Sequence, residues 1–362
     1  MSLKVAIVGC GKIADGHVEE IGKMPDLARV VAVCDLEPLM AEQLAMRYGI
    51  PRYYGDLVEL LEKERPDVIH ITTPPQSHLE IARRVVDAGC HVMVEKPLTL
   101  THADSLQLVE LVAKAGRSLT VGYTYFFDPP AVIVRDLVAS GALGEPVHVE
   151  SFFGYDLAGT FGSALLADPN HWVHRLPGKL FHNNIDHMLN KALEFIEEET
   201  PAVAAFAATR REKRFGDGRD AMADELRVVL RGRKTTAYAT FSGHARPAAH
   251  FLRVYGTRRS LHADFVARTV VFDDGAKLPS ALGRMLPAFS ISRQYAREGW
   301  RNAVRFARSD YHFFAGLNRL LRLYYQSILD GSPPPITSRD MLRVSAAMEE
   351  VFRQVAQASE GS

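Results

Sequence analysis

The stretch VAIVGCGKIADGH, residues 5–17, decides how the N-terminal part of this chain folds. Its run of Val and Ile residues favours a buried β-strand, and Gly9-x-Gly11-x-x-Ala14 follows directly. Glycines at this spacing allow a tight turn into a helix, whose N-terminus and exposed N–H groups favour a pyrophosphate. The stretch therefore predicts a dinucleotide-binding turn. We expect five residues to contact the dinucleotide: Gly9, Gly11, Lys12, Ile13 and Ala14.

Outward from this stretch, strand-like and helix-like segments alternate along the first third of the chain. The apolar runs expected to form strands are 3–9, 28–35, 67–73, 91–96 and 118–123. The segments expected to form helices lie near 12–24, 37–48, 56–64, 77–89 and 101–115. Runs that are apolar at nearly every position suit strands buried on both faces of a parallel sheet. The alternation predicts a doubly wound, Rossmann-type α/β domain over residues 1–124.

The rhythm changes after residue 124, where strand-like runs follow one another without helices between them. After a helix near 130–140, they occupy 146–153, 202–211, 225–232, 234–243, 250–265 and 269–274. Gly232 and Arg233 between two of these runs suggest a hairpin. Clustered strands predict a C-terminal α+β domain over 125–362, with a large, mostly antiparallel open sheet. Within it we assign 279–310 as a basic insertion and 311–358 as C-terminal helices, near 311–328 and 338–357.

Composition excludes several classes of protein. The 362 residues contain 43 Lys+Arg and 43 Asp+Glu, so no basic excess indicates a nucleic-acid partner. The three cysteines, Cys10, Cys34 and Cys90, fit neither a disulfide nor a zinc framework, which favours a reduced, cytoplasmic protein. The sequence has no signal-peptide pattern and no apolar run of about 18 residues, so we expect no transmembrane segment.

The nature of the dinucleotide is indicated by Asp35, which ends the second strand 26 positions after Gly9. A carboxylate at this place accepts hydrogen bonds from ribose hydroxyls and repels a 2′-phosphate. It is followed by Leu36 and Glu37, not by an arginine. The pattern therefore favours NAD over NADP.

Two further strand ends should lie at the same edge of the sheet, because carboxyl ends of parallel strands meet there. We expect the cofactor to be lined by Thr72, Thr73, Pro74, Pro75, His78, Glu95 and Lys96. The prolines could also simply end a strand before Ser77 caps a helix, and both roles are compatible. A lysine beside a nicotinamide could polarise a substrate oxygen. The residues alone leave open whether Lys96 does so or is a solvent-exposed loop lysine.

The segment 171–196 is unusually rich in histidine and asparagine. As one helix from about residue 180, it would carry an apolar stripe of Phe181, Ile185, Met188, Leu189, Ala192 and Ile196. A polar stripe would contain Asn183, His187, Asn190 and Glu194. Asn183 and His187 would then be one turn apart and able to touch. This pattern predicts that Asn183 orients His187 as a catalytic acid or base.

The same segment could also be considered as a metal site. His171, His174, His182 and His187 fall within 17 positions, with Asp186 close by. Their spacing matches no known zinc signature, so we expect no metal. We expect four residues to contact a substrate instead: Tyr123, Trp172, His174 and Asn184. Trp172 could equally be a core residue.

Taken together, the GxGxxA turn, the Thr-Pro-Pro-x-x-His loop at 73–78 and Glu95-Lys96-Pro97 resemble the glucose–fructose oxidoreductase/inositol dehydrogenase (Gfo/Idh/MocA) family. The resemblance spans residues 4–275 and resumes in the C-terminal helices. It implies that Lys96 helps to bind both nicotinamide and substrate. It also implies a cis Lys96–Pro97 bond.

A third family pattern, Gly-Gly…Asp-x-Gly-x-His-x-x-Asp, is only partly matched. Gly178 and His187 keep the family's residues, whereas Asn183, Ile185 and Asn190 replace an aspartate, a glycine and an aspartate. The resemblance implies that His187 accepts the substrate's hydroxyl proton. An amide at 183 can still orient the ring but cannot stabilise an imidazolium by charge. The arginine pair that often follows Gly122 in the family is also absent, so we place the chain in a divergent branch.

The resemblance implies an NAD-dependent oxidoreductase that transfers a hydride between nicotinamide and a secondary alcohol or ketone of a sugar, a cyclitol or a sugar derivative such as a nucleotide-sugar. A homodimer or homotetramer formed through the C-terminal sheet is also expected. Two alternatives remain: a non-catalytic dinucleotide-binding sensor or regulatory subunit, and an enzyme that never releases its NAD. Asn183 and Ile185 keep the sensor hypothesis open, since they depart from the family's pattern.

The insertion 279–310 is the one strongly basic stretch. It contains six arginines against Glu298 and Asp310, together with Tyr295, Trp300 and Phe306. If helical, Arg293, Arg297, Arg301 and Arg305 form a basic ridge. Such a ridge fits an anionic substrate or a membrane surface, but it also fits a solvated helix face or a subunit contact.

Overall fold

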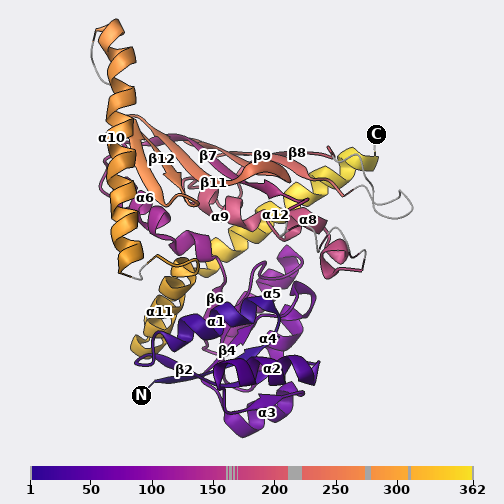
Figure 1. Cartoon of the computed structure of the whole chain (residues 1–362). Helices are drawn as coiled ribbons and strands as arrows, with labels where there is room; N and C mark the ends of the chain where they lie inside the picture. The colour runs from indigo at the N-terminus through magenta and orange to yellow at the C-terminus, as the bar shows by residue number, and fades with distance from the viewer. Residues whose placement is uncertain are drawn as a thin grey trace. The chain divides into compact units, whose positions relative to one another are not determined.

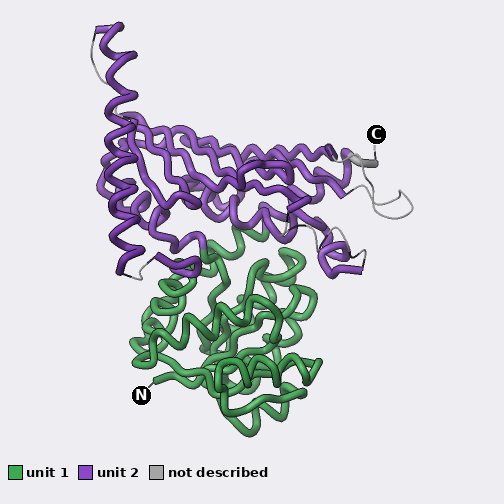
Figure 2. Tube along the Cα trace, viewed as in Figure 1, with its two compact units in different colours: residues 1–124, 316–345 green, residues 125–315, 346–362 purple. Residues whose placement is uncertain are grey.

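The computed structural model describes residues 2–159, 162, 165, 168, 170–210, 222–273, 279–308 and 311–360. Residues 211, 274, 309 and 310, including Asp310, belong to predicted segments but lie outside the described residues. Figure 2 divides the chain into two compact units: unit 1 holds residues 1–124 and 316–345, and unit 2 holds residues 125–315 and 346–362. The predicted border after residue 124 coincides with this division. Residues 316–345, which we had assigned to the second domain, instead belong to unit 1.

Unit 1 is built on a six-stranded sheet with the order β3-β2-β1-β4-β5-β6 (Figure 1). Its strands are β1 (Leu3–Val8), β2 (Ala28–Cys34), β3 (Tyr53–Tyr54), β4 (Val68–Ile71), β5 (His91–Val94) and β6 (Leu119–Val121). All neighbouring strands are parallel, so the predicted doubly wound Rossmann arrangement is confirmed. The two-residue β3 was not predicted, because its sequence is too short to show a periodic pattern.

Five helices connect these strands, as predicted. They are α1 (Lys12–Gly22), α2 (Pro38–Tyr48), α3 (Leu57–Glu64), α4 (His78–Asp87) and α5 (His102–Lys114). Local chemistry explains where some of them begin: Asp56 and Thr101 accept hydrogen bonds from the N–H groups of Glu59 and Asp104, which are otherwise unpaired in a helix's first turn.

Helix α11 (Ala315–Asp330) explains why residues far along the chain belong to unit 1. Tyr324 is fully buried, and its hydroxyl donates to the carbonyls of Val92 and Ser118 at 2.8 Å each. Tyr325 is equally buried and bonds His70. The contacts are long-range, so no local sequence pattern indicates them. The following helix, α12 (Ser338–Glu360), contributes residues to both units.

Unit 2 is built on a seven-stranded sheet with the order β13-β12-β11-β7-β10-β9-β8. The strands are β7 (Pro146–Asp156), β8 (Ala202–Ala208), β9 (Glu225–Arg231), β10 (Thr236–Ser242), β11 (His244–Gly256), β12 (Ser260–Asp264) and β13 (Thr269–Asp273). β7 and β10 are parallel and the other neighbours are antiparallel, which confirms a mostly antiparallel sheet. The hairpin at Arg233 joins β9 to β10. Two elements precede β7: η2 (Thr124–Phe127) and α6 (Pro129–Ala139).

The single helix predicted from residue 180 is wrong. After η3 (Trp172–Arg175), the chain forms two short helices, α8 (Lys179–His182) and α9 (Asp186–Leu193). Between them, the side-chain amide of Asn184 donates to the Leu180 carbonyl at 2.8 Å. Asparagine side chains compete with the backbone in this way and disfavour a helix interior. All eight residues of α9 are buried, so its polar residues do not form an exposed stripe.

The condition set for the basic ridge holds, because the insertion forms a helix: α10 spans Ser280–Ala307. It lies along the β13 edge of the sheet, and its N-terminal end extends beyond the sheet (Figure 1). Within the described residues, none of the helices combines the length and the apolar character needed to cross a membrane.

Candidate functional site

The glycine turn in unit 1 has one closed side and one open side. Gly9 has φ +97°, and a Cβ atom there would lie 2.7 Å from the backbone nitrogen of Thr73. Gly11 is the N-cap of α1, and a Cβ atom there would meet nothing within 4 Å. The turn thus packs tightly against the loop after β4, while the N-terminus of α1 stays uncovered. An uncovered helix N-terminus of this kind suits a phosphate group.

Asp35 lies next to this turn. Its carboxylate accepts the backbone N–H of Cys10 at 2.7 Å and of Glu37 at 2.9 Å, which fixes its orientation at the end of β2. It is partly exposed. The donor set therefore fits a dinucleotide: N–H groups for phosphate and a carboxylate for ribose hydroxyls.

The neighbouring cysteines do not take part in this chemistry. Burial, with a smaller contribution from the Asp35 carboxylate, raises the pKa of the Cys10 and Cys34 thiols to about 12. Both thiols are free and buried. They remain protonated near neutral pH, so they pack as small apolar groups.

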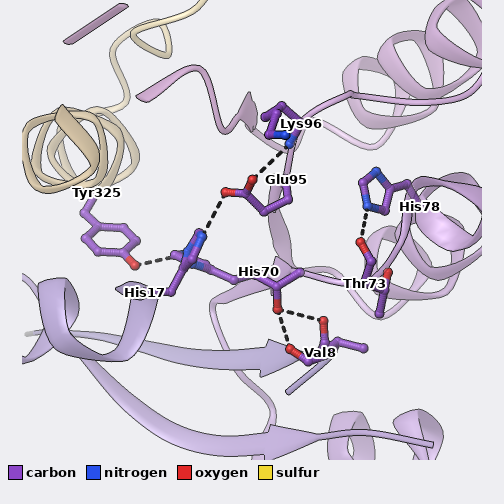
Figure 3. Close-up of polar contacts among 10 residues, drawn as sticks. Val8, His17, His70, Thr73, His78, Glu95, Lys96 and Tyr325 are labelled. Carbon is purple, nitrogen blue, oxygen red and sulfur yellow. Dashed lines mark hydrogen bonds and ion pairs between the residues drawn. The ribbon is translucent and has the colours of Figure 1, made fainter. Parts of the chain in front are cut away.

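The predicted loop after β4 is tied to its neighbours on both sides. The Thr72 hydroxyl donates to the Gly9 carbonyl at 2.6 Å. His78 is buried, and its Nε2 lies 2.8 Å from the Thr73 carbonyl (Figure 3). Its Nδ1 lies 3.1 Å from the Pro97 carbonyl. Pro75 is buried and begins η1 (Pro75–Ser77), whereas Pro74 is exposed. The structure thus brings together the glycine turn, the Thr-Pro-Pro loop and the Glu-Lys-Pro turn.

A buried chain of hydrogen bonds ends at Glu95 (Figure 3). Glu95 Oε1 lies 3.0 Å from His17 Nε2, His17 Nδ1 lies 2.8 Å from His70 Nδ1, and His70 Nε2 lies 2.8 Å from the Tyr325 hydroxyl. Sequence reasoning missed His17, His70 and Tyr325. They come from α1, β4 and α11, and only the folded unit places them together.

The protonation states in this chain follow from burial. Burial lowers the pKa of His70 well below its usual value, with His17 adding to the effect, and burial raises the pKa of Tyr325 well above its usual range. Tyr325 therefore keeps its proton and donates to His70 Nε2. A neutral His70 then carries its proton on Nδ1 and donates to His17, which donates from Nε2 to Glu95. With one proton on each imidazole ring, each of the three hydrogen bonds between Tyr325 and Glu95 has one donor and one acceptor.

The turn after β5 is held by the same carboxylate. Glu95 Oε2 accepts the backbone N–H of Lys96 at 3.2 Å, and Lys96–Pro97 is cis, as the resemblance implied. The carboxylate lies directly against Gly122, where a Cβ atom would be 2.6 Å from Glu95 Oε1. The Glu95 carboxylate thus fixes the backbone of Lys96, while the side chain of Lys96 is half-buried.

In unit 2, His187 lies in the first turn of α9 and is 8% exposed. Its ring meets the rings of Tyr125 and Phe153 edge-on, with centroids 4.8 and 5.5 Å away. Its Nδ1 lies 3.8 Å from Asp186 Oδ1. Asn183 lies at the end of α8, on the other side of the helix break, so the one-turn spacing of a continuous helix does not apply to this pair.

Lys191 is another residue that the sequence pattern did not indicate. It is fully buried, and its ammonium group donates to the His187 carbonyl and lies 5.7 Å from the Tyr125 ring centre. Burial lowers the pKa of Lys191 to about 7, although the carboxylates of Asp128, Asp186 and Glu194 act in the opposite direction. Its spacing of four residues from His187 is the signal that could have identified it.

The four predicted substrate contacts are scattered. Tyr123 is 2% exposed and packs in the core of unit 1, because its backbone continues directly from β6. Asn184 is also buried, held by the Leu180 carbonyl and the Tyr155 hydroxyl. Trp172 is half-buried and stacks on His171 at 5.5 Å, and His174 bonds the Leu165 carbonyl at 3.1 Å.

No three His, Cys, Asp or Glu side chains gather as metal ligands anywhere in the described part of the chain.

Comparisons with known proteins agree with this architecture. Residues 3–123 match the family model "Oxidoreductase family, NAD-binding Rossmann fold", and residues 132–262 match "GFO/IDH/MocA C-terminal domain". D-glucoside 3-dehydrogenase from Escherichia coli is 34% identical over 144 residues, which is 40% of this chain and 41% of that protein. Myo-inositol 2-dehydrogenase from Thermotoga maritima is 26% identical over 272 residues, covering 74% of this chain and 77% of that protein. Matches to the Escherichia coli protein and to inositol 2-dehydrogenases of Salmonella thus span less than half of their length.

Solved structures share the fold over nearly the whole chain. The WlbA dehydrogenase from Bordetella pertussis, in complex with NADH and UDP-GlcNAcA, superimposes with a TM-score of 0.78 at 18% identity, covering 99% of this chain and 96% of that one. Aldose-aldose oxidoreductase from Caulobacter crescentus gives a TM-score of 0.75 at 22% identity, covering 99% and 98%.

Proposed function

The chain belongs to the Gfo/Idh/MocA family of oxidoreductases, and on this premise we propose that it is an NAD-dependent dehydrogenase acting on a secondary alcohol of a sugar, a cyclitol or a nucleotide-sugar. One observation carries the proposal: the glycine turn, Asp35 and the Glu95-Lys96-Pro97 turn gather at the carboxyl edge of one parallel sheet. Ligands of doubly wound sheets bind at this edge. The names of the relatives supply the substrate class.

The residues of unit 1 fit the dinucleotide. The uncovered N-terminus of α1, with Gly11, Lys12 and Ile13, would hold the pyrophosphate, and the Asp35 carboxylate would accept the ribose hydroxyls. When bound, NAD supplies the acceptor for a hydride from the substrate carbon. Asp35 disfavours a 2′-phosphate, so NAD is preferred over NADP.

Lys96 and His187 are the proposed catalytic residues. Lys96 orients and polarises the substrate oxygen, because its backbone is fixed by Glu95 while its side chain is not fully buried. His187 accepts the hydroxyl proton, since its ring is held by Tyr125 and Phe153 beside a carboxylate. The proposed role of Asn183 is limited to orienting His187, because a neutral amide cannot stabilise an imidazolium by charge. The two proposed catalytic residues belong to different units.

The finer expectations stay proposals as well. We propose a cytoplasmic protein, because its cysteines are free and buried. A homodimer or homotetramer through the sheet of unit 2 is supported by exposed large side chains on its strands: Val147, Phe206, Val229, Tyr238 and Tyr255. Nothing in the comparisons favours the non-catalytic alternative, since the relatives named above are all dehydrogenases or oxidoreductases.

A panel assay tests the proposed function. Purified protein is mixed with NAD or NADP and with inositols, glucosides, free aldoses and UDP-sugars, and formation of NADH or NADPH is followed at the absorbance maximum of the reduced nicotinamide. We expect turnover with at least one member of the panel and a higher kcat/KM with NAD than with NADP. Binding of NAD without turnover on any member would contradict the proposal and favour the sensor.

A further inference from the structure

Helix α10 is attached to unit 2 by one face only. Gln294 donates to and accepts from the backbone of Phe272 in β13 at 3.0 and 2.8 Å, and Asn302 donates to the Ala267 carbonyl at 2.8 Å. Glu298, between them in the sequence, is buried. Positions 294, 298 and 302 fall on one side of a helix, so this side is the packed face.

The opposite side of α10 carries large apolar residues that nothing in the described chain covers. Their exposed fractions are 43% for Leu282, 52% for Met285, 39% for Leu286, 68% for Phe289, 75% for Trp300 and 44% for Val304. At 3.6 residues per turn they form a stripe roughly 100° wide, centred opposite Glu298. The first turns, which extend beyond the sheet in Figure 1, are exposed except at Gly283 and Pro287. An apolar stripe of this length on a free helix side indicates a binding surface.

One flank of this stripe is positively charged, because Arg293, Arg297, Arg301 and Arg308 follow one side of the helix next to it. Helix α10 contains five arginines, at 284, 293, 297, 301 and 305, and Arg308 caps its C-terminus. Glu298 is its only acidic residue, and it is already paired with Arg301 and Arg297. The whole chain has a formal charge of zero, so this local excess is a property of the helix and not of the composition. The surface therefore complements an anionic partner.

A second copy of the chain packed antiparallel is a poor occupant for this stripe. If two such helices packed antiparallel about a two-fold axis, each flank would meet its own symmetry copy. The row Arg293, Arg297 and Arg301 would then face the same row of the partner, which is unfavourable. A lipid bilayer avoids this conflict, because guanidinium groups bind phosphates well and Trp and Phe side chains suit the headgroup boundary.

We propose that α10 is a membrane-surface helix that binds bilayers containing anionic lipids. The stripe from Leu282 to Val304 inserts at the boundary between headgroups and acyl chains, and the arginines beside it bind lipid phosphates. The helix lies on the membrane and does not cross it. This places a dehydrogenase-like chain at a lipid surface, which is a property separate from its proposed reaction.

Vesicle binding of the full chain tests the proposal. Sedimentation with vesicles of phosphatidylcholine alone is compared with vesicles containing about one third phosphatidylglycerol. We expect binding only to the anionic vesicles, weakening as salt is raised because exposed charges are screened. Phe289→Ser with Trp300→Ser, or Arg293→Gln with Arg297→Gln and Arg308→Gln, should each reduce the bound fraction at least tenfold. Met46→Ser is the control, since Met46 is 76% exposed on α2 and should leave binding unchanged.

A spectroscopic measurement locates the contact. The chain has two tryptophans, Trp172 and Trp300, so Trp172→Phe leaves Trp300 as the sole reporter. Its emission should shift to shorter wavelength on anionic vesicles alone. Absence of both binding and shift, binding that the α10 variants do not change, or a dimer in solution that the Phe289→Ser/Trp300→Ser variant dissociates would overturn the proposal. The last result would assign the stripe to a second copy. Circular dichroism spectra of the variants should match that of the unmodified chain.

Discussion

Gly9 and Gly11, two positions apart in the turn after β1, have different surroundings. A side chain at Gly9 would collide with the backbone of Thr73 within the protein, at 2.7 Å, and its φ of +97° is unfavourable for other residues. At Gly11 the space is open in the protein itself. Only a ligand held at the N-terminus of α1 would make that space necessary. The fold therefore requires a glycine at position 9, whereas at position 11 only the proposed ligand requires one.

This difference gives a prediction for alanine substitutions. Gly9→Ala should lower the free energy of unfolding by about 1–3 kcal/mol or more and also weaken NAD binding. Gly11→Ala should keep stability within about 1 kcal/mol but raise the Kd for NAD at least ~10-fold, equivalent to about 1.4 kcal/mol. Gly22→Ala, at the other end of α1 and equally open, is the control and should leave the Kd unchanged. Urea denaturation and calorimetric titration measure both quantities. Unchanged NAD affinity in Gly11→Ala would argue against the binding site.

The two adjacent buried tyrosines of α11 provide another matched pair. Tyr324 bonds only backbone carbonyls in the contacts described above, whereas Tyr325 begins the chain that reaches Glu95 and the Lys96 turn. We expect Tyr325→Phe and Tyr324→Phe each to cost about 1–2 kcal/mol of stability. Tyr325→Phe alone should lower kcat several-fold with little change in KM, since Lys96 would lose a fixed backbone. Equal kcat values for the two variants would show that the chain is purely structural.

At the scale of elements, the sequence predicted most of the regular structure and misjudged one segment. The strand–helix alternation of unit 1 and the clustered strands of unit 2 have clear periodicities, so both sheets were predicted. Helix α10 was considered only as a condition for the arginine ridge and was not predicted. The segment 180–196 was misjudged, because its apolar spacing favours one helix while the side chain of Asn184 bonds the Leu180 carbonyl and breaks it. The chain Glu95–His17–His70–Tyr325 could not be predicted either, since it joins residues up to 255 positions apart.

Lys191 in helix α9 should make the stability of the native protein depend on pH. Burial depresses the pKa of Lys191 from 10.5 to about 7. Between pH 7 and about 10 the unfolded chain therefore binds a proton that the folded chain lacks, so the stability of the native protein rises with pH in this window. Below pH 7 both states are protonated, and the cost of the buried charge is fully present.

The variant Lys191→Met provides the reference for this effect. Relative to this variant, the unsubstituted protein should gain about 1 kcal/mol of unfolding free energy for each pH unit between 7 and 9. Urea denaturation of both proteins at three pH values within that window measures the difference, and other titrating groups cancel. A difference that stays constant with pH would contradict a neutral, buried Lys191.

For the whole molecule, the proposed chemistry is divided between two units. Unit 1 holds the dinucleotide residues and Lys96, and unit 2 holds His187 with Tyr125 and Lys191. Residues 316–345 return to unit 1 late in the chain, and α12 contributes to both units. The fold class and the cofactor edge were accessible from sequence because their motifs are local. The surroundings of His187 were not, because η2 and β7 bring Tyr125 and Phe153 beside its ring only after folding.

The most direct measurement compares Lys96→Ala and His187→Ala with the unmodified protein, using the best substrate from the panel. For each protein, the turnover number and the Kd for NAD are determined, with Lys114→Ala as a control for loss of an exposed lysine. We expect turnover to fall at least ~100-fold in both variants, the size expected for a lost general acid–base group. The Kd for NAD should remain measurable and change little, and Lys114→Ala should behave like the unmodified protein. Full turnover in either Lys96→Ala or His187→Ala would contradict the proposed mechanism.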